Sequence, residues 1–312
     1  MENAPFSSDI ADGPEDARSF WLTARDGVRI RISLWGQAKK GTVLLLPGRT
    51  EFVEKYGRVA RILAARGYAT LAIDWRGQGL ADRLLDDPNK GHVTQFTDYQ
   101  MDLDAVIAAL PKLGLDADKL YLIAHSMGGC IGLRAVMEGL KVRAAVFSAP
   151  MWGLPVAKPL RLLAHTLSHT GLGRLYVPGN EGATSYAATT PFEGNTLTSD
   201  AEALAFMQAQ TTAHPELALG APTLQWATEA FAEMAALEKM PSPDLPAIGF
   251  TGADEEIVTN SAVKHRMARW SKGQYKDFPG ARHEIMMERA DVQNSFFERT
   301  FDLFEHAPAR SG

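Results

Sequence analysis

The chain has 312 residues, of which 46% are hydrophobic and 22% are charged, and its formal net charge is −5. This is an ordinary globular balance, and the length suits one large domain with an insertion or two small domains. The mild negative charge gives no electrostatic reason to expect a nucleic-acid partner, and no basic face for anionic membranes. The single cysteine, Cys130, excludes an internal disulfide framework and a cysteine-rich metal site.

The beginning of the chain is acidic and lacks the apolar stretch of a secretory signal. No apolar run reaches the ~20 residues that span a bilayer. We therefore expect a soluble, cytoplasmic protein with no transmembrane segment, for which transient contact with a membrane surface stays open. Residues 1–17 are polar, and we expect them to be frayed.

Strand and helix patterns alternate along most of the chain. Residues 19–36 read as two strands joined at Asp26-Gly27, which is a strong hairpin signal. Short apolar runs then alternate with segments of helical periodicity, which predicts a mostly parallel sheet with crossover helices on both faces. The predicted strands are 41–48, 68–75, 119–126, 142–150, 245–252 and 273–280, and the predicted helices are 52–67, 96–114, 129–140, 261–270 and a last helix ending near Glu305.

The alternation stops at about Met151 and resumes at about residue 241. Residues 151–240 carry helical patterns but no convincing strand. We therefore predict a core of residues 1–150 plus 241–312, with a helical cap of residues 151–240 inserted between two core strands. The cap should cover the carboxyl edge of the parallel strands, and one stripe of each cap helix should bury against the core. Any groove left between cap and core should be apolar and suited to an alkyl chain, because the cap helices carry large apolar residues: Leu163, Phe206, Met207, Trp226 and Phe231.

A candidate nucleophile lies in the hexapeptide AHSMGG, residues 124–129. Ser126 would occupy a tight turn between a buried strand and a helix, which pushes its hydroxyl out of the sheet edge. Small residues must stand two positions to either side of such a serine, because a larger side chain would collide with the packed strand or helix. Gly128 satisfies this requirement, and Ala124 departs from the G-x-S-x-G pattern by one methyl group. A plain helix-capping serine is the alternative, and the position at the end of a buried strand disfavours it.

His283 is the candidate base. A Ser, acid, His order along the chain places the base just after the last strand, and His283 follows the predicted strand 273–280. His125 is adjacent to Ser126, but neighbouring side chains on a strand point to opposite faces. We interpret the histidines other than His283 as ordinary polar residues: His92, His125, His165, His169, His214, His265 and His306.

The acid should follow the predicted strand 245–252, where three carboxylates compete. In comparable loops the acid usually lies three residues after the glycine, here Gly252, which favours Glu255. Asp254 is the commoner residue type and lies one position earlier, so it remains the alternative. Glu256 is expected to be solvated. The acid would hold the imidazole tautomer and stabilise the imidazolium without taking the proton.

Two backbone amides are expected to form the oxyanion hole. Met127 follows the nucleophile at a helix N-terminus, where amides lack intrahelical partners. The second donor should come from the turn after the strand 41–48. There, Gly48 allows a close approach to the substrate and Arg49 would donate its amide.

These motifs resemble the lysophospholipase and monoacylglycerol lipase branch of the α/β-hydrolases. The resemblance implies structural roles for Asp74 and Arg76 in the DWRGQG run. The sequence departs from the branch at Pro47, which replaces the usual histidine before the oxyanion glycine, and at Ala124. The matching segments are residues 46–84, 124–129, 252–258 and 279–288.

The resemblance implies an α/β-hydrolase fold and a serine carboxylic ester hydrolase acting on a monoacyl lipid. It implies neither a metal nor an organic cofactor, and a small-molecule lipid or ester as the partner. A peptidase, thioesterase or acyltransferase on the same fold is the alternative, because fold does not choose among these reactions. A non-catalytic binding protein is a third reading, which the complete Ser, acid and His set disfavours.

Overall fold

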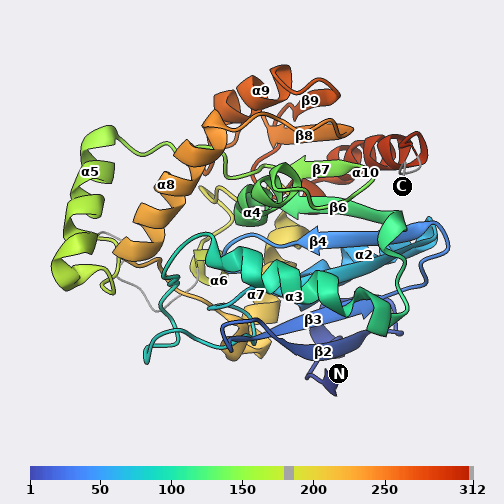
Figure 1. The fold of residues 1–312 in the computed structure, drawn as a ribbon, viewed down its shortest axis with the longest axis horizontal. Helices are drawn as coiled ribbons and strands as arrows, with labels where there is room; N and C mark the ends of the chain where they lie inside the picture. The colour runs from blue at the N-terminus through green and yellow to red at the C-terminus, as the bar shows by residue number, and fades with distance from the viewer. Residues whose placement is uncertain (179–185, 309–312) are drawn as a thin grey trace.

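The computed structural model describes residues 1–178 and 186–308, so part of the predicted cap, residues 179–185, lies outside the described residues. A nine-stranded sheet has the order β1-β2-β3-β5-β4-β6-β7-β8-β9 (Figure 1). The pairs β1/β2, β2/β3 and β3/β5 are antiparallel, and all other pairs are parallel. The mostly parallel sheet expected from the sequence is thereby confirmed. The strands are β1 (Glu2–Asn3), β2 (Arg18–Thr23), β3 (Arg29–Trp35), β4 (Gly41–Leu46), β5 (Tyr68–Asp74), β6 (Leu120–His125), β7 (Ala145–Ser148), β8 (Ala247–Gly252) and β9 (Gly273–Phe278).

Helices cover both faces of this sheet, which explains why the central strands are apolar throughout. Alternate residues of β4 point to opposite faces, and each set joins a separate core cluster. Helices α3, α4 and α9 pack in one cluster, and α2 and α10 pack in the other. The helices are α1 (Ser8–Ala11), α2 (Gly57–Ala65), α3 (Asp98–Leu113), α4 (Ser126–Met137), α5 (Lys158–Leu167), α6 (Tyr186–Thr189), α7 (Ala201–Ala213), α8 (Leu224–Lys239), α9 (Asn260–Ala268) and α10 (Ala290–Glu305).

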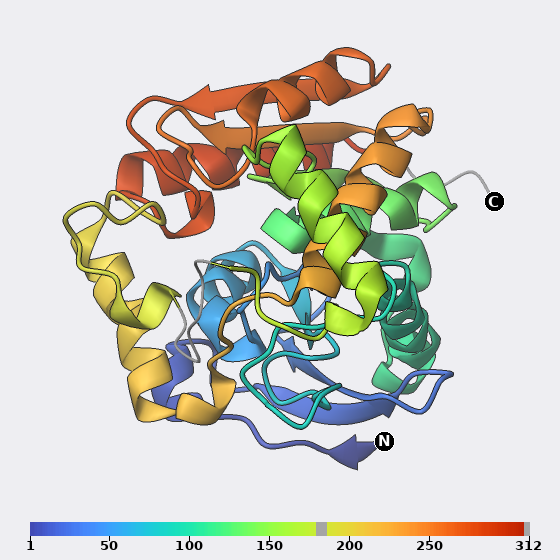
Figure 2. The same cartoon turned by 90° about the vertical axis from the view of Figure 1, so that its left-hand side faces the viewer.

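The predicted cap contains α5 to α8, and its described residues add no strand to the sheet. Helix α8 packs against α4 of the core, and α5 packs on α8 (Figures 1 and 2). As a result α5 is separated from the core and buries none of its side chains. The expectation that every cap helix buries a stripe against the core is therefore wrong for α5, where Leu163 is 52% exposed.

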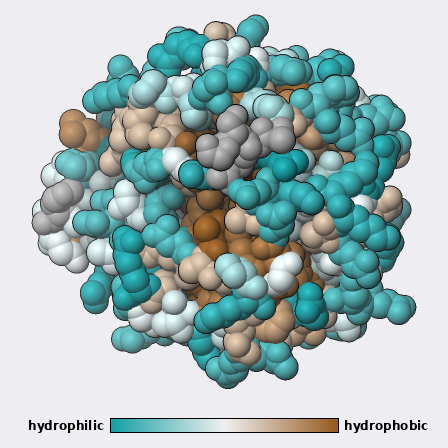
Figure 3. Space-filling view, turned by 45° about the vertical axis from the view of Figure 1, so that its right-hand side comes forward, coloured by the Kyte–Doolittle hydropathy of each residue, from teal (hydrophilic) through white to brown (hydrophobic). Residues whose placement is uncertain are grey.

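Exposed apolar side chains concentrate in this same region. Figure 3 shows a different face, with the right-hand side of Figure 1 turned forward; hydrophilic residues cover most of this face, and hydrophobic residues gather in one hollow near its centre. Among the described residues, no helix is long and apolar enough to cross a bilayer. Apart from Met1, the large hydrophobic residues that are exposed all belong to the cap: Leu160, Leu162, Leu163, Leu172, Leu175, Tyr186 and Phe192.

The N-terminal segment is packed, so the expectation that residues 1–17 are frayed is wrong. Strand β1 pairs with β2, and Ala11 at the end of α1 is buried. Asp12 pairs with Arg58 and Arg61 of α2. A polar composition did not reveal these contacts, because they depend on partners far along the chain.

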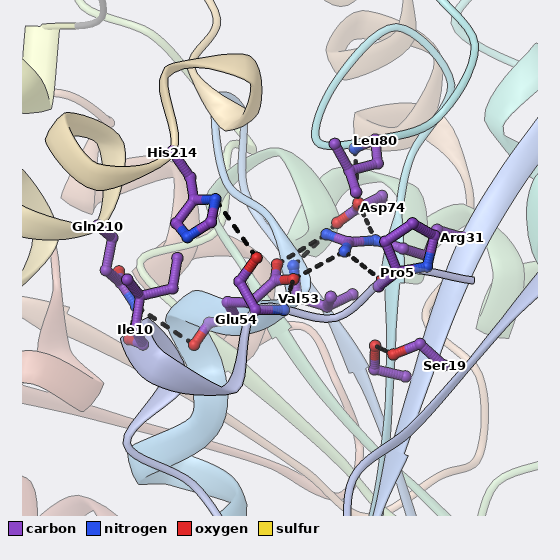
Figure 4. Close-up of polar contacts among 12 residues, drawn as sticks. Pro5, Ile10, Ser19, Arg31, Val53, Glu54, Asp74, Leu80, Gln210 and His214 are labelled. Atoms are coloured by element: carbon purple, nitrogen blue, oxygen red, sulfur yellow. Dashed lines mark hydrogen bonds and ion pairs between the residues drawn. The ribbon is translucent and has the colours of Figure 1, made fainter. Parts of the chain in front are cut away.

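A buried ion cluster anchors this segment to β3 and to the end of β5 (Figure 4). Arg31 of β3 forms ion pairs of 2.7 Å with both Glu54 and Asp74, and it donates a hydrogen bond to the Pro5 carbonyl. The Asp74 carboxylate also accepts from the Val53 amide at 2.8 Å. Asp74 therefore has the structural surroundings that the family resemblance implied, and it links β5 to the segment that follows β4.

Candidate functional site

Ser126 lies on a strained turn between β6 and α4. Its backbone φ is +49°, in the left-handed region that side-chain-bearing residues rarely adopt. The close packing of the turn explains the need for Gly128, because a Cβ there would collide with the carbonyl oxygens of Leu46 and Pro47. Strain held by packing at an exposed sheet edge is typical of functional sites.

The departure at Ala124 is accommodated by a glycine on the following helix. A Cβ built on Gly132 would lie 3.2 Å from the Ala124 methyl group, tighter than an ordinary contact. Gly132 therefore provides the space that the extra methyl group occupies, and the turn around Ser126 keeps its shape.

His283 is oriented by a buried carboxylate. Its Nδ1 lies 2.7 Å from Oε2 of Glu255, whose side chain has no exposed surface. The other oxygen, Oε1, accepts hydrogen bonds from the amides of Ile257 at 2.6 Å and Val258 at 3.1 Å. Burial raises the pKa of Glu255, but the nearby imidazole and these hydrogen bonds outweigh it and hold the pKa below its ordinary value. The carboxylate thus stays ionised and holds the proton of His283 on Nδ1. This leaves Nε2 as the nitrogen that can accept a proton.

The competing carboxylates do not reach His283. Asp254 and Glu256, on either side of Glu255, are both exposed. The structure therefore brings Glu255 and His283 together and leaves the alternative acid, Asp254, in solvent. That Glu255 acts as the acid of a triad remains our proposal.

Ser126 and His283 line the same cavity of about 930 Å³. The oxyanion loop, Pro47 to Glu51, forms part of its wall, and a Cβ at Gly48 would lie 3.0 Å from the Cβ of Ser126. The Arg49 amide donates to no other described residue. Both predicted donors, the amides of Arg49 and Met127, thus lie next to the proposed nucleophile, and their role in an oxyanion hole remains a proposal.

Two residues of the DWRGQG run hold the oxyanion loop, a role that the sequence analysis missed. Trp75 donates its indole N–H to the Pro47 carbonyl at 2.9 Å, and Gln78 donates its amide to the Gly48 carbonyl at 2.8 Å. With its carbonyls fixed in this way, the loop can direct the Arg49 amide at the cavity. The sequence feature that could have identified these two residues is the presence of hydrogen-bonding side chains just after a buried strand.

A buried charge network lies beneath the site; we call Glu51, Lys55, Tyr56, His125 and Glu284 the Glu51 network. Lys55 Nζ lies 2.6 Å from Glu51 and 2.7 Å from Glu284. His125 Nε2 lies 3.3 Å from Glu51 and 3.4 Å from Glu284, and its Nδ1 donates to a backbone carbonyl. Glu51 also accepts hydrogen bonds from Tyr56 and from the Gly48 amide.

The two carboxylates keep both cations charged. Burial lowers the pKa of His125, but the charges of Glu51 and Glu284 outweigh burial and raise it to about 10. Burial likewise opposes the charge of Lys55, and the same two carboxylates raise its pKa above the ordinary value. Two negative groups thus face two positive groups in a buried position.

By residue type, Glu51, His125 and Glu284 could hold a metal ion, since their ligand atoms lie within 4.8 Å of one another. However, Lys55 Nζ already contacts both carboxylates, and protonated His125 has no lone pair to offer. The residues therefore fit an internal ion network better than a cation site.

This network joins the segments that carry the proposed catalytic groups. Glu51 ends the oxyanion loop, His125 precedes Ser126, and Glu284 follows His283. The His125 ring also lies against the His283 ring, with a centroid distance of 4.8 Å. The interpretation of His125 as an ordinary polar residue missed this position, because strand alternation says nothing about which loops cover the opposite face.

The contact between Glu255 and His283 predicts that substitutions at Glu255 and at its neighbour Asp254 will affect kcat differently. Glu255→Gln should lower kcat by about 10⁴, because the amide can no longer fix the His283 tautomer or stabilise its charge. Asp254→Asn is the matched control and should change kcat little. Steady-state kinetics on a soluble ester measures both. A larger loss with Asp254→Asn would overturn the assignment of the acid.

The Glu51 network predicts a pH-dependent stability difference. His125→Gln should lower the free energy of unfolding by about 3–5 kcal/mol at pH 7, since it leaves buried carboxylates under-compensated. The folded pKa of His125, about 10, lies above the unfolded value near 6.5. The charge on His125 therefore makes its full contribution to the free energy of unfolding below pH ~6.5, and this contribution decreases as the pH rises toward 10.

The difference in unfolding free energy between the wild type and His125→Gln should consequently shrink from pH 7 to about pH 10. Urea unfolding across this range measures it, with the exposed His265→Gln on α9 as the control. A difference that is constant or grows with pH would show that His125 is neutral in the folded protein.

Comparisons with known proteins agree with this architecture. The chain is 28% identical over 301 residues to lysophospholipase L2 of Escherichia coli (strain K12), covering 93% of this chain and 88% of that protein. It is also 28% identical to a probable lysophospholipase L2 of Haemophilus influenzae, covering 83% and 82% of the two chains.

Among solved structures, a soluble variant of monoglyceride lipase from Saccharomyces cerevisiae superposes with a TM-score of 0.73 at 21% identity, covering 93% of this chain and 97% of that one. A carboxyl esterase from Bacillus coagulans gives 0.74 at 16% identity, covering 93% and 98%. These likenesses show the α/β-hydrolase fold. A family model described as serine aminopeptidase, S33, matches residues 37–290, so the chain belongs to this family of α/β-hydrolases.

Proposed function

We propose that this chain is a serine carboxylic ester hydrolase that acts on a monoacyl lipid through an acyl-enzyme intermediate. The observation that carries the proposal is that Ser126, on a strained turn, and His283, oriented by Glu255, line one cavity. The names of the relatives, lysophospholipase L2 and monoglyceride lipase, support a monoacyl lipid as the substrate class.

The proposed reaction uses each group in turn. The Ser126 hydroxyl attacks the ester carbonyl and gives its proton to Nε2 of His283, and the amides of Arg49 and Met127 stabilise the oxyanion. The C–O bond to the alcohol then breaks, and the alcohol leaves with the proton from His283. Water attacks the acyl-enzyme with His283 as base, which releases the fatty acid and restores Ser126. Glu255 stays ionised throughout and stabilises the imidazolium.

The cavity wall supports an acyl-chain site. Of the five cap residues expected to contribute, Met207 and Trp226 line the cavity. The ring of Phe206 instead packs under Arg58, and that of Phe231 packs under Arg161. Apolar lining residues from core and cap also include Phe52, Met151, Leu154, Leu197, Ile257 and Val258.

A peptidase is the second candidate, because the matching family is described as serine aminopeptidase. An aminopeptidase needs an anionic or carbonyl-rich subsite for the substrate's amino group. The carboxylates of Glu51 and Glu284 are neutralised within the Glu51 network. Glu256, which is exposed, is therefore the cavity carboxylate available to such an amino group. The experiments described next also distinguish a thioesterase, an acyltransferase and a non-catalytic binding protein.

Fluorophosphonate labelling of the wild type and of Ser126→Ala tests the catalytic serine. The wild type should label and hydrolyse acyl esters, and Ser126→Ala should lose labelling and about 10⁶ in kcat with its fold intact. A panel of acyl esters, thioesters and aminoacyl amides then separates the candidate reactions. Labelling that persists in Ser126→Ala would refute the nucleophile, and preference for aminoacyl amides would favour the peptidase.

The apolar cavity predicts a chain-length dependence. Because each buried methylene contributes about 0.8 kcal/mol, kcat/KM for p-nitrophenyl esters should rise over several methylenes before levelling off. The esters must be used below their micelle concentrations. A flat profile, or the highest value with acetate, would remove the case for a lipid substrate.

A further inference from the structure

Arg49 lines the same cavity as Ser126, and its side chain contacts two other residues that line it, Gly220 and Trp226. Its guanidinium donates one hydrogen bond, from Nη2 to the Gly220 carbonyl, and stands over the Trp226 ring with its central carbon 5.3 Å from the centroid. Its Nε is buried and has no hydrogen-bond partner. Among residues 1–178 and 186–308, no carboxylate forms an ion pair with Arg49.

Other buried cations in the described part of the chain are compensated differently. Arg31, Lys55 and Arg76 each contact two carboxylates. Arg266 forms no ion pair, but it donates to two backbone carbonyls and a hydroxyl. Arg49 has a single carbonyl for a group with several N–H donors, so much of its hydrogen-bonding capacity is unused.

The charge on Arg49 is nevertheless retained. Burial lowers the pKa of Arg49 to about 10, which keeps the guanidinium protonated at neutral pH. An anion that entered the cavity would restore the lost solvation, and a guanidinium fork matches phosphate oxygens in a bidentate arrangement.

The surroundings leave space for the guanidinium beside the cavity. A side chain at Gly91 would collide with it, so the glycine provides room. Gly220, Ala221 and Pro222 of the cap form the adjoining cavity wall. Arg49 thus lies where the oxyanion loop meets the cap.

The other charged groups at the cavity do not supply a free positive charge. Lys55 is paired with Glu51 and Glu284 within the Glu51 network. Glu256 contributes an exposed negative charge, and it should disfavour an anion at its own side of the cavity. Arg49 is therefore the cation of the cavity that has no carboxylate partner among the described residues.

We propose that the Arg49 side chain binds the phosphate of a lysophospholipid headgroup while the scissile ester occupies Ser126. The inference rests on the proposed function and narrows its substrate class from monoacyl lipids to those that carry a phosphodiester. The glycerol backbone joins ester and phosphate in such a lipid. One residue would then serve both ends, with its amide at the oxyanion and its guanidinium at the phosphate.

The test compares two substrates with the same short acyl chain, a lysophosphatidylcholine and a monoacylglycerol, both below their micelle concentrations. Arg49→Gln should lower the ratio of kcat/KM for lysophosphatidylcholine to that for monoacylglycerol by roughly ten- to hundredfold. The ratio cancels any effect of the substitution on the fold or on the Arg49 amide. Arg299→Gln, exposed on α10, controls for the loss of one positive charge and should leave the ratio unchanged.

Binding gives a second readout that needs no turnover. In a Ser126→Ala background, calorimetry measures Kd for an ether-linked lysophosphatidylcholine and for the alkylglycerol of equal chain length. Arg49→Gln should weaken the former roughly ten- to hundredfold more than the latter. Arg49→Lys should recover part of the binding, since it keeps the charge but not the planar fork.

The outcomes separate the two proposals. If the wild type hydrolyses both lipids and Arg49→Gln lowers both equally, the phosphate subsite is refuted and the ester hydrolase stands. If the wild type hydrolyses neither lipid, the proposed function fails, and the calorimetric difference still decides whether Arg49 binds phosphate. Equal weakening of both ether ligands would overturn the subsite in either case.

Discussion

Two carboxylates and two cations share one buried position beneath the proposed catalytic groups, and the geometry of the site depends on their mutual compensation. Removing such charges from water costs several kcal/mol per ion, and only close pairing offsets this cost. Each of the segments that must converge supplies a member: Glu51 from the oxyanion loop, His125 from the end of β6, and Glu284 from the loop of His283. A shift of any one segment would leave a charge unpaired, so the Glu51 network fixes their relative positions.

This constraint also accounts for the strain in the site. Ser126 and Thr50 both have positive φ values, +49° and +68°, and neither is a glycine. Such conformations persist only where the surroundings over-determine them. Gly128 packs against the end of β4. The loop that contains Thr50 is held at Gly48, whose carbonyl accepts from Gln78 and whose amide donates to Glu51. The rigid sheet edge and the ion network thus hold the nucleophile and the oxyanion loop in otherwise unfavourable shapes.

The sequence predicted those features that depend on local patterns. Strand and helix alternation predicted the parallel sheet, and the position of Ser126 at a strand end, with His283 after the last strand, predicted which residues meet at the cavity. Loop spacing favoured Glu255, the carboxylate that contacts His283. The packing of residues 1–17, the outward position of α5 and the Glu51 network depend on long-range partners, which residue periodicity does not encode. Asp12 and Glu51 look like surface residues until the chain segments that face them are known.

On the proposed role of Arg49, substrate choice depends on the junction between core and cap and not on the cap alone. Its backbone belongs to the core loop that the Glu51 network fixes, and its guanidinium reaches the cap at Gly220 and Trp226. A rearrangement of the cap would therefore change the environment of Arg49 without moving its amide from Ser126. The reaction at Ser126 can then stay the same while substrate recognition varies. The core positions the reacting atoms, and the junction between core and cap contacts the part of the substrate beyond the ester.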